Sequence, residues 1–206
     1  MKSLTRYITT LFVIIGCSLS VSANNAASLL DKAAQKFQQA KSITADFTIS
    51  GNGNLSSGNI AISGDRFKIK MNEISIWYDG RTQWTYSQPV NEISITEPTP
   101  DELQQVNPFA IISAFRKAYS ATTLNNGNDI ATLQLTPLSS HDEAISKVVL
   151  TLNKSTLFPT QIVLTLDNGE SITIKVISVK IGNTLPLSTF TYNELSYPNA
   201  EIIDLR

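Results

Sequence analysis

Apolar residues recur at every second position between residues 67 and 96, and this pattern constrains the fold more than any other part of the sequence. Phe67, Ile69 and Met71 alternate with lysines, and the same spacing returns on either side of the Asp79-Gly80 turn. A period of two predicts antiparallel β-strands that have one apolar face and one face in contact with water. The segment is therefore expected to form a half-buried antiparallel sheet.

A proline-rich stretch interrupts this pattern. Pro98, Pro100 and Pro108 break the sheet, and residues 109–115 are predicted to form a short, very apolar helix. A sheet with an apolar face and an apolar helix near it can hold an apolar ligand. The sequence thus favours binding over catalysis.

The first 23 residues are predicted to be an export signal. Lys2 and Arg6 supply the positive start, residues 11–15 supply the apolar core, and Ala23 is an acceptable residue before a signal-peptidase cleavage site. The apolar run is too short to span a membrane. Cleavage is therefore expected before Asn24, with export to the periplasm.

A second interpretation of the same region is a lipobox. Ile14-Ile15-Gly16-Cys17 resembles the motif in which the cysteine becomes the lipidated first residue. Simple cleavage is favoured, because Leu19 and Val21 extend the apolar character past Cys17 and a good cleavage site lies downstream. The lipoprotein alternative stays open. Under the favoured interpretation, residues 24–206 form a single mature domain.

The composition of the mature chain excludes general nucleic-acid binding. Removal of residues 1–23 takes away two basic residues and no acid, so the net charge of −1 becomes −3. A mildly acidic chain lacks the basic face that nucleic-acid binding needs. Cys17 is the only cysteine, so an exported protein without it must be stabilised by its core rather than by a disulfide.

The rest of the chain extends the β pattern and adds a helix at the start of the mature protein. Leu30, Ala33 and Phe37 lie on one stripe of a predicted amphipathic helix. A phase slip of the apolar row at Ile177 predicts a β-bulge or a sharp bend. About eleven antiparallel strands without crossover helices predict a mainly β sheet, barrel or sandwich with helices added on one face.

Signals for catalysis or metal binding are weak. The single histidine, His141, lies in a polar turn, and without a second histidine or a mature-chain cysteine a zinc site is not expected. No serine lies in a Gly-x-Ser-x-Gly elbow. Asp101 and Glu102 follow Pro100, where acids suit the first turn of a helix. No enzyme activity, metal or cofactor is predicted.

Two blocks of the sequence resemble the LolA-type periplasmic lipoprotein carriers. The first runs from Trp77 to Tyr86 and contains an Asp-Gly-x-Thr-x-Trp-x-Tyr pattern, and the second is Asn107-Pro108-Phe109. The order of predicted elements is similar over nearly the whole mature chain. The resemblance implies a curved, incompletely closed antiparallel β-barrel whose helices form a lid over an apolar cavity.

The resemblance also implies a function and its partners. Members of this family accept acylated lipoproteins from an ATP-driven releasing complex in the inner membrane. They carry the acyl chains across the periplasm to an outer-membrane acceptor, without catalysis or a cofactor. A monomer is expected. Two alternatives remain, namely a lipid- or lipoprotein-sensing module of the same fold, and an outer-membrane-anchored receptor if Cys17 is lipidated.

The cavity residues that the resemblance implies come from the first helix, three strands and the predicted lid. They are Phe37, Phe67, Ile69, Met71, Ile76, Trp84, Tyr86, Phe109 and Ile112. From the apolar pattern alone, the same side chains could form the closed core of a β-sandwich. Arg66 lies near the position of an arginine that latches the lid in this family. The Ser63-Gly64-Asp65 turn departs from the family's proline-containing turn, so the latch is not assigned to Arg66.

Overall fold

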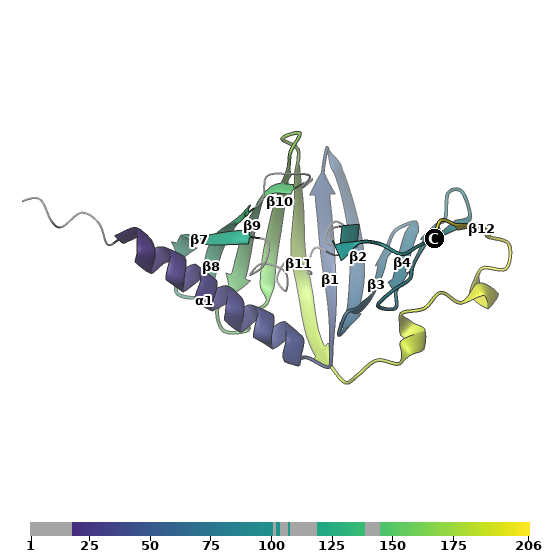
Figure 1. Ribbon diagram of the computed structural model, residues 1–206, viewed down its shortest axis with the longest axis horizontal. Helices are drawn as coiled ribbons and strands as arrows, with labels where there is room; N and C mark the ends of the chain where they lie inside the picture. Colours follow the sequence, from purple (N-terminus) through teal and green to yellow (C-terminus); the bar gives the residue numbers. More distant parts are fainter. Residues whose placement is uncertain (1–17, 101, 104–106, 108–118, 139–144) are drawn as a thin grey trace, which may run out of the picture.

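Twelve β-strands form one curved sheet in the computed structural model (Figure 1), which describes residues 18–100, 102–103, 107, 119–138 and 145–206. Helix α1 (Ser18–Gln39) precedes the strands, and two 3-10 helices, η1 (Leu187–Thr189) and η2 (Glu194–Ser196), lie near the C-terminus. The strands are β1 (Ser42–Gly51), β2 (Asn54–Ser63), β3 (Arg66–Met71), β4 (Ile74–Tyr78), β5 (Gln83–Ser87), β6 (Glu92–Thr96), β7 (Tyr119–Asn126), β8 (Ile130–Pro137), β9 (Ile145–Asn153), β10 (Pro159–Leu166), β11 (Ser171–Gly182) and β12 (Glu201–Asp204).

The sheet is open, with β12 at one end and β7 at the other. Its order is β12-β6-β5-β4-β3-β2-β1-β11-β10-β9-β8-β7, and neighbouring strands are antiparallel except for β12 and β6, which are parallel. This curved, incompletely closed sheet confirms the predicted fold class, although it has one strand more than expected. Strand β12 escaped prediction because it has four residues, Glu-Ile-Ile-Asp, with no period of two.

The two halves of the sheet meet where β1 pairs with β11. Asp46 pairs with Ser178 and Phe47 pairs with Val176, which leaves Ile177 as an extra residue on β11. The extra residue confirms the bulge that the phase slip predicted. Bulges bend a strand and increase its twist, and here the bend falls at the centre of the sheet.

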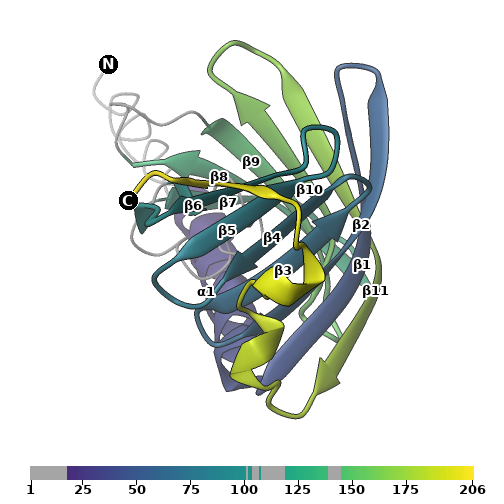
Figure 2. The same cartoon turned by 90° about the vertical axis from the view of Figure 1, so that its right-hand side faces the viewer.

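Helix α1 crosses the hollow of the curved sheet (Figure 2). Its apolar stripe, formed by Ala26, Leu30 and Ala33, is fully buried and belongs to the same core as apolar residues from both halves of the sheet. The structure thus confirms the predicted amphipathic helix. Because Ala23 lies within α1, cleavage after Ala23 would leave residues 24–39 of the helix in the mature protein.

A helical turn begins just after the first half of the sheet. The backbone N–H and the hydroxyl of Thr99 donate to Glu102 Oε2 at 2.8 and 2.9 Å, and the Glu102 N–H donates to Thr99 Oγ1 at 3.4 Å. This reciprocal pattern is a capping box, and the hydrogen bonds from Thr99 lower the pKa of Glu102. It confirms Glu102 in the first turn of a helix. The predicted apolar helix at 109–115 and the turn around His141 lie outside the described residues.

Gly58 lies where the core leaves no room for a side chain. It pairs with Phe47 on β1 and with Met71 on β3. A Cβ atom at Gly58 would lie 2.6 Å from Met71 Cγ and 2.8 Å from Phe47 Cζ. We therefore expect Gly58→Ala to lower the free energy of unfolding by about 1–3 kcal/mol through overpacking, as measured by urea denaturation.

Gly127→Ala is the matched control for this substitution. The nearest atom to a Cβ at Gly127 would be the Ile130 carbonyl oxygen, at the ordinary contact distance of 3.4 Å. The control is expected to change the free energy of unfolding little. Equal losses in the two variants would contradict the close approach of Phe47 and Met71 to Gly58.

Candidate functional site

The strand register divides β3 and β4 into two faces. Phe67 pairs with Tyr78, and Ile69 pairs with Ile76. Paired residues on antiparallel strands point to the same side of a sheet, and these four, together with Met71, pack in the core that includes α1. They therefore lie on the concave face. Phe67 and Ile69 are 2% and 3% exposed, whereas Met71 and Ile76 are half-buried.

Trp84 and Tyr86 lie on the opposite, convex face, which corrects the expectation that they share a cavity with Ile76. The β4–β5 hairpin pairs Trp84 with Trp77 and Tyr86 with Ser75, the two neighbours of Ile76 along β4. Neighbouring residues of a strand point to opposite faces. A cavity on the concave face therefore includes Ile76 but excludes Trp84 and Tyr86.

The Asp79-Gly80 turn sets this register. The Asp79 carboxylate accepts hydrogen bonds from the backbone N–H groups of residues 81 and 82 at 2.9 and 2.8 Å, and Gly80 has a φ of 106° that favours glycine. The turn places Gln83 opposite Tyr78. Odd-numbered residues of β5 consequently share a face with even-numbered residues of β4. The alternation within each strand does not show which of its two sets of residues shares a face with a given set on the neighbouring strand.

An aromatic cluster covers the convex face and includes residues from the C-terminal segment. The ring centre of Trp77 lies 5.7 Å from that of Tyr197 and 6.1 Å from that of Tyr192, and the rings of Tyr86 and Tyr197 are 4.5 Å apart. Phe190, from the same segment, is fully buried. The chain between β11 and β12 thus lies over the outer side of β3 to β5 (Figure 2). Sequence reasoning missed this cluster, for which the three C-terminal aromatic residues were the available signal.

Arg66 contacts the same C-terminal segment. Its guanidinium carbon lies 5.6 Å from the centre of the Phe190 ring, and its Nε–H donates to the Ser63 carbonyl oxygen at 3.4 Å. Arg66 precedes the concave-facing Phe67 by one residue, so its side chain leaves the sheet on the convex side. These contacts connect Arg66 to the residues that follow β11, and a lid latch stays unassigned.

The remaining predicted cavity residues are divided between α1 and the part of the chain that the structure does not describe. Phe37, near the end of α1, packs edge to face against Phe158 with ring centres 5.1 Å apart, and it is half-buried beside the core. Phe109 and Ile112 lie outside the described residues. The predicted site residues that the structure brings together on one face are Phe67, Ile69, Met71 and Ile76.

The concave face becomes polar from Tyr78 on β4 to Gln83 and Thr85 on β5. Tyr78 is 7% exposed, and its burial, followed by the nearby carboxylates of Asp65 and Asp79, raises its pKa above the usual 10.0. Gln83 is 9% exposed, and its Nε2 donates to Thr85 Oγ1 at 3.3 Å. Its Oε1 atom is buried and finds no hydrogen-bond partner among the described residues.

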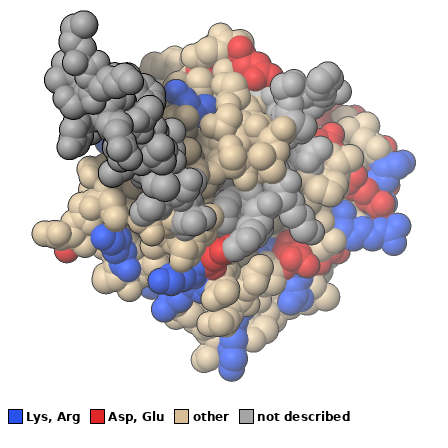
Figure 3. Space-filling model, turned by 60° about the vertical axis from the view of Figure 1, so that its left-hand side comes forward, with Lys and Arg blue, Asp and Glu red and all other residues tan. Residues whose placement is uncertain are grey.

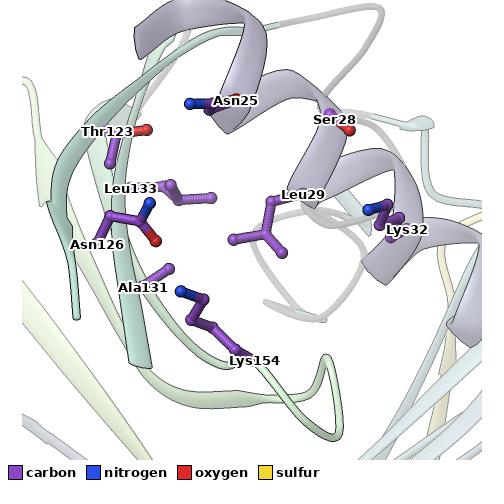
Figure 4. A pocket seen from close by; sticks show the side chains of 9 residues that line it. All are labelled: Asn25, Ser28, Leu29, Lys32, Thr123, Asn126, Ala131, Leu133 and Lys154. Carbon is purple, nitrogen blue, oxygen red and sulfur yellow. The ribbon is translucent and has the colours of Figure 1, made fainter. Parts of the chain in front are cut away.

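A separate pocket of about 230 Å³ lies between α1 and strands β7 and β8 (Figure 4). Its lining is mixed, since Leu29 and Leu133 are apolar whereas Lys32 and Lys154 are basic. The Lys154 ammonium already donates to the Gly127 carbonyl oxygen at 2.8 Å. The other lining residues are Asn25, Ser28, Thr123, Asn126 and Ala131. This mixed pocket contains none of the predicted cavity residues.

Charged side chains of both signs are interspersed on the face of the molecule that Figure 3 shows. In the described ranges, Arg81 pairs with Glu97 at 3.1 Å and Arg206 pairs with Asp204 at 2.6 Å.

The described residues contain no group of three or more His, Cys, Asp or Glu side chains placed to hold a metal. No helix in the described part of the chain is long and apolar enough to cross a bilayer.

The concave face of the curved open sheet is apolar along β3 and β4, and concave apolar surfaces are common ligand-binding sites in proteins. The sequence profile of the family described as "Outer membrane lipoprotein carrier protein LolA" matches residues 17–168. The chain belongs to this family, as the Asp-Gly-x-Thr-x-Trp-x-Tyr pattern predicted. No curated protein matches the chain.

Two solved structures share the fold at low sequence identity, and a third has a lower structural similarity. An uncharacterized conserved protein from Thermus thermophilus has a TM-score of 0.60 and 12% identity, with 86% of this chain and 98% of that chain covered. A DUF1329 family protein from Desulfovibrio piger has a TM-score of 0.52 and 12% identity, with 83% and 98% covered. A putative outer membrane lipoprotein-sorting protein domain from Vibrio parahaemolyticus has a TM-score of 0.48 and 11% identity, with 82% and 97% covered.

Tyr78 makes the stability of the protein depend on pH in the alkaline range. Burial raises its pKa, so the folded protein holds this proton more tightly than the unfolded chain does. The resulting stabilisation is fully present below the unfolded pKa of 10.0 and is lost as the pH rises through the higher folded value. We expect Tyr78→Phe to reduce the fall in the free energy of unfolding between about pH 9 and pH 11, measured by urea denaturation.

Part of the alkaline fall in the free energy of unfolding is expected to persist in Tyr78→Phe, because burial also raises the pKa of Tyr192. The double variant Tyr78→Phe, Tyr192→Phe should therefore show a smaller fall than either single variant. A fall in Tyr78→Phe identical to that of the unmodified protein would show that Tyr78 ionises freely and is not buried in solution.

Proposed function

We propose that this protein is a periplasmic carrier that binds the acyl chains of lipoproteins in an apolar cavity and transfers them from the inner to the outer membrane. The observation that carries the proposal is the apolar concave face that Phe67, Ile69, Met71 and Ile76 form on an open sheet. Membership of the lipoprotein carrier family supports it. Its partners would be acylated lipoproteins, an inner-membrane lipoprotein-releasing complex and an outer-membrane acceptor, with the carrier acting as a monomer.

The hydrophobic effect alone can hold an acyl chain on such a face. Each buried methylene contributes about 0.8 kcal/mol, so roughly ten methylenes supply about 8 kcal/mol, the equivalent of a micromolar dissociation constant before the cost of association. Binding of this kind needs no catalytic group and no cofactor. It also tolerates differences between lipoproteins, because the acyl chains are the shared part.

Acyl chains can reach the concave face only when the elements that cover it move apart. Phe67 and Ile69 are almost completely buried, and they share one core with Leu30 of α1. In the empty protein, core packing therefore shields these side chains from water. Cargo and core packing compete for the same apolar surface, which lowers the net affinity and makes release to an acceptor possible.

Ile76 and Trp84 provide a matched test of which face binds acyl chains. They are half-buried residues of neighbouring strands and lie on opposite faces. We expect Ile76→Gln to weaken binding of a fluorescent fatty-acid probe about tenfold, since loss of about 1.4 kcal/mol of apolar contact corresponds to that factor. Trp84→Gln should bind the probe as the unmodified protein does.

Uptake of an acylated lipopeptide, followed by native mass spectrometry, gives a second readout for the same pair, with thermal unfolding as the check on folding. Normal uptake by Ile76→Gln together with lost uptake by a folded Trp84→Gln would place binding on the convex face. Failure of the unmodified protein to take up either probe or lipopeptide would contradict the carrier function itself.

The proposed location depends on how the N-terminal segment is processed. Cleavage after Ala23 releases a periplasmic carrier, whereas lipidation of Cys17 would produce an outer-membrane-anchored receptor of the same fold. We expect the intact mass of the protein isolated from its own cell envelope to correspond to a chain that begins at Asn24. A diacylglyceryl-modified chain that begins at Cys17 would favour the receptor.

A further inference from the structure

Gln83 is a buried amide on the concave face, and one of its two polar atoms is left without a partner. Its position opposite Tyr78 on β4 and opposite Thr96 on β6 places it on the same side of the sheet as Ile76. Only 9% of the residue is exposed. The amide nitrogen donates to Thr85 Oγ1 at 3.3 Å, while the carbonyl oxygen has no donor among the described residues.

A buried carbonyl oxygen without a donor is unfavourable, because it has given up its hydrogen bonds to water and gained none in return. Native structures keep few such groups, and each one calls for an explanation. Gln83 lies on the face proposed to receive cargo. A cargo molecule that brings a hydrogen-bond donor to this position would satisfy the oxygen that the empty protein leaves unpaired.

The surroundings of Gln83 select the kind of donor. Its neighbours on this face are Tyr78 on β4, Thr85 on β5 and Thr96 on β6. These three side chains carry hydroxyl groups and no carboxylate, and the unpaired atom is a neutral oxygen. A buried ammonium group would need a carboxylate partner, so a neutral donor is favoured. Acyl chains and their esters carry no N–H group. An amide-linked acyl chain carries one N–H directly beside its first methylenes.

We propose that Gln83 Oε1 accepts a hydrogen bond from the N–H of an amide-linked acyl chain, so that the cavity distinguishes amide-linked from ester-linked acyl groups. The inference rests on the proposed carrier function and adds a specificity-determining residue to it. Apolar contacts with Phe67, Ile69 and Ile76 would supply affinity for either kind of chain. Gln83 would supply the preference between them, because an unpaired polar group discriminates against the ligand that cannot pair with it.

Two ligands of the same length and shape test this preference. N-methylpalmitamide has one amide N–H, and methyl palmitate has an ester oxygen in its place. Each ligand competes with a bound fluorescent fatty acid, which yields two dissociation constants and their ratio. The test variant is Gln83→Met, which keeps the length of the side chain and removes its polar atoms. The matched control is Thr96→Val, which replaces a hydroxyl with a methyl group at the position opposite Gln83.

We expect the ratio of the ester dissociation constant to the amide dissociation constant to fall roughly fivefold to tenfold in Gln83→Met, because the amide loses one hydrogen bond. Binding of the ester should change by less than about twofold, because the ester makes no hydrogen bond to the carbonyl oxygen. Thr96→Val should keep the ratio of the unmodified protein. If Gln83→Met no longer binds the ester, Gln83→Leu serves as the second variant and is judged by the same ratio.

The possible outcomes separate this inference from the proposed function. An unchanged ratio in a Gln83 variant that binds the ester overturns the role of Gln83 and leaves the carrier function standing. An equal drop of the ratio in Thr96→Val also overturns it, because the preference would then belong to the whole polar end of the face. Failure of both ligands to displace the fluorescent fatty acid from the unmodified protein overturns acyl-chain binding itself.

Discussion

The pairing of β1 with β11 joins the two halves of the sheet, and the rest of the structure depends on it. The two strands lie far apart in the sequence, with Ser42 opposite Gly182 at one end and Ser50 opposite Thr173 at the other. The bulge at Ile177 lies within this pair and adds twist and bend at the centre of the sheet. A bent sheet has a hollow side, and α1 fills part of it, so that apolar side chains from both halves meet in one core.

The strands β3 and β4 bury apolar side chains on both faces, and different parts of the chain cover the two faces. Ile69 on the concave face packs in the core with α1, whereas Trp77 on the convex face packs against Tyr192 and Tyr197 of the C-terminal segment. Because α1 covers the concave face and the C-terminal segment covers the convex face, the contacts on one face can change while the other face stays packed. In the proposed carrier, the convex cluster would hold the strands in register while the concave face alternates between core packing and cargo.

Prediction from the sequence succeeded where a feature depends on neighbouring residues and failed where it depends on a turn or on distant contacts. The alternation of Phe67 and Ile69 correctly indicated a strand with one buried face. Trp84 was assigned to the wrong face because the hydrogen bonds of the Asp79-Gly80 turn decide the phase between β4 and β5. The importance of Gln83 was missed, since a polar residue in an alternating strand usually faces water.

The sequence by itself determined the alternating strands between residues 67 and 96, the apolar stripe of α1, the bulge at Ile177 and the resemblance to the lipoprotein carriers, because periodicity and short motifs are local properties of a chain. Only the tertiary structure decided that Trp84 faces the C-terminal segment, that β12 joins β6 in parallel, and that the Gln83 carbonyl oxygen is buried without a donor. Each of these features depends on which residues meet across the fold, and contacts between distant residues leave no regular pattern in the sequence.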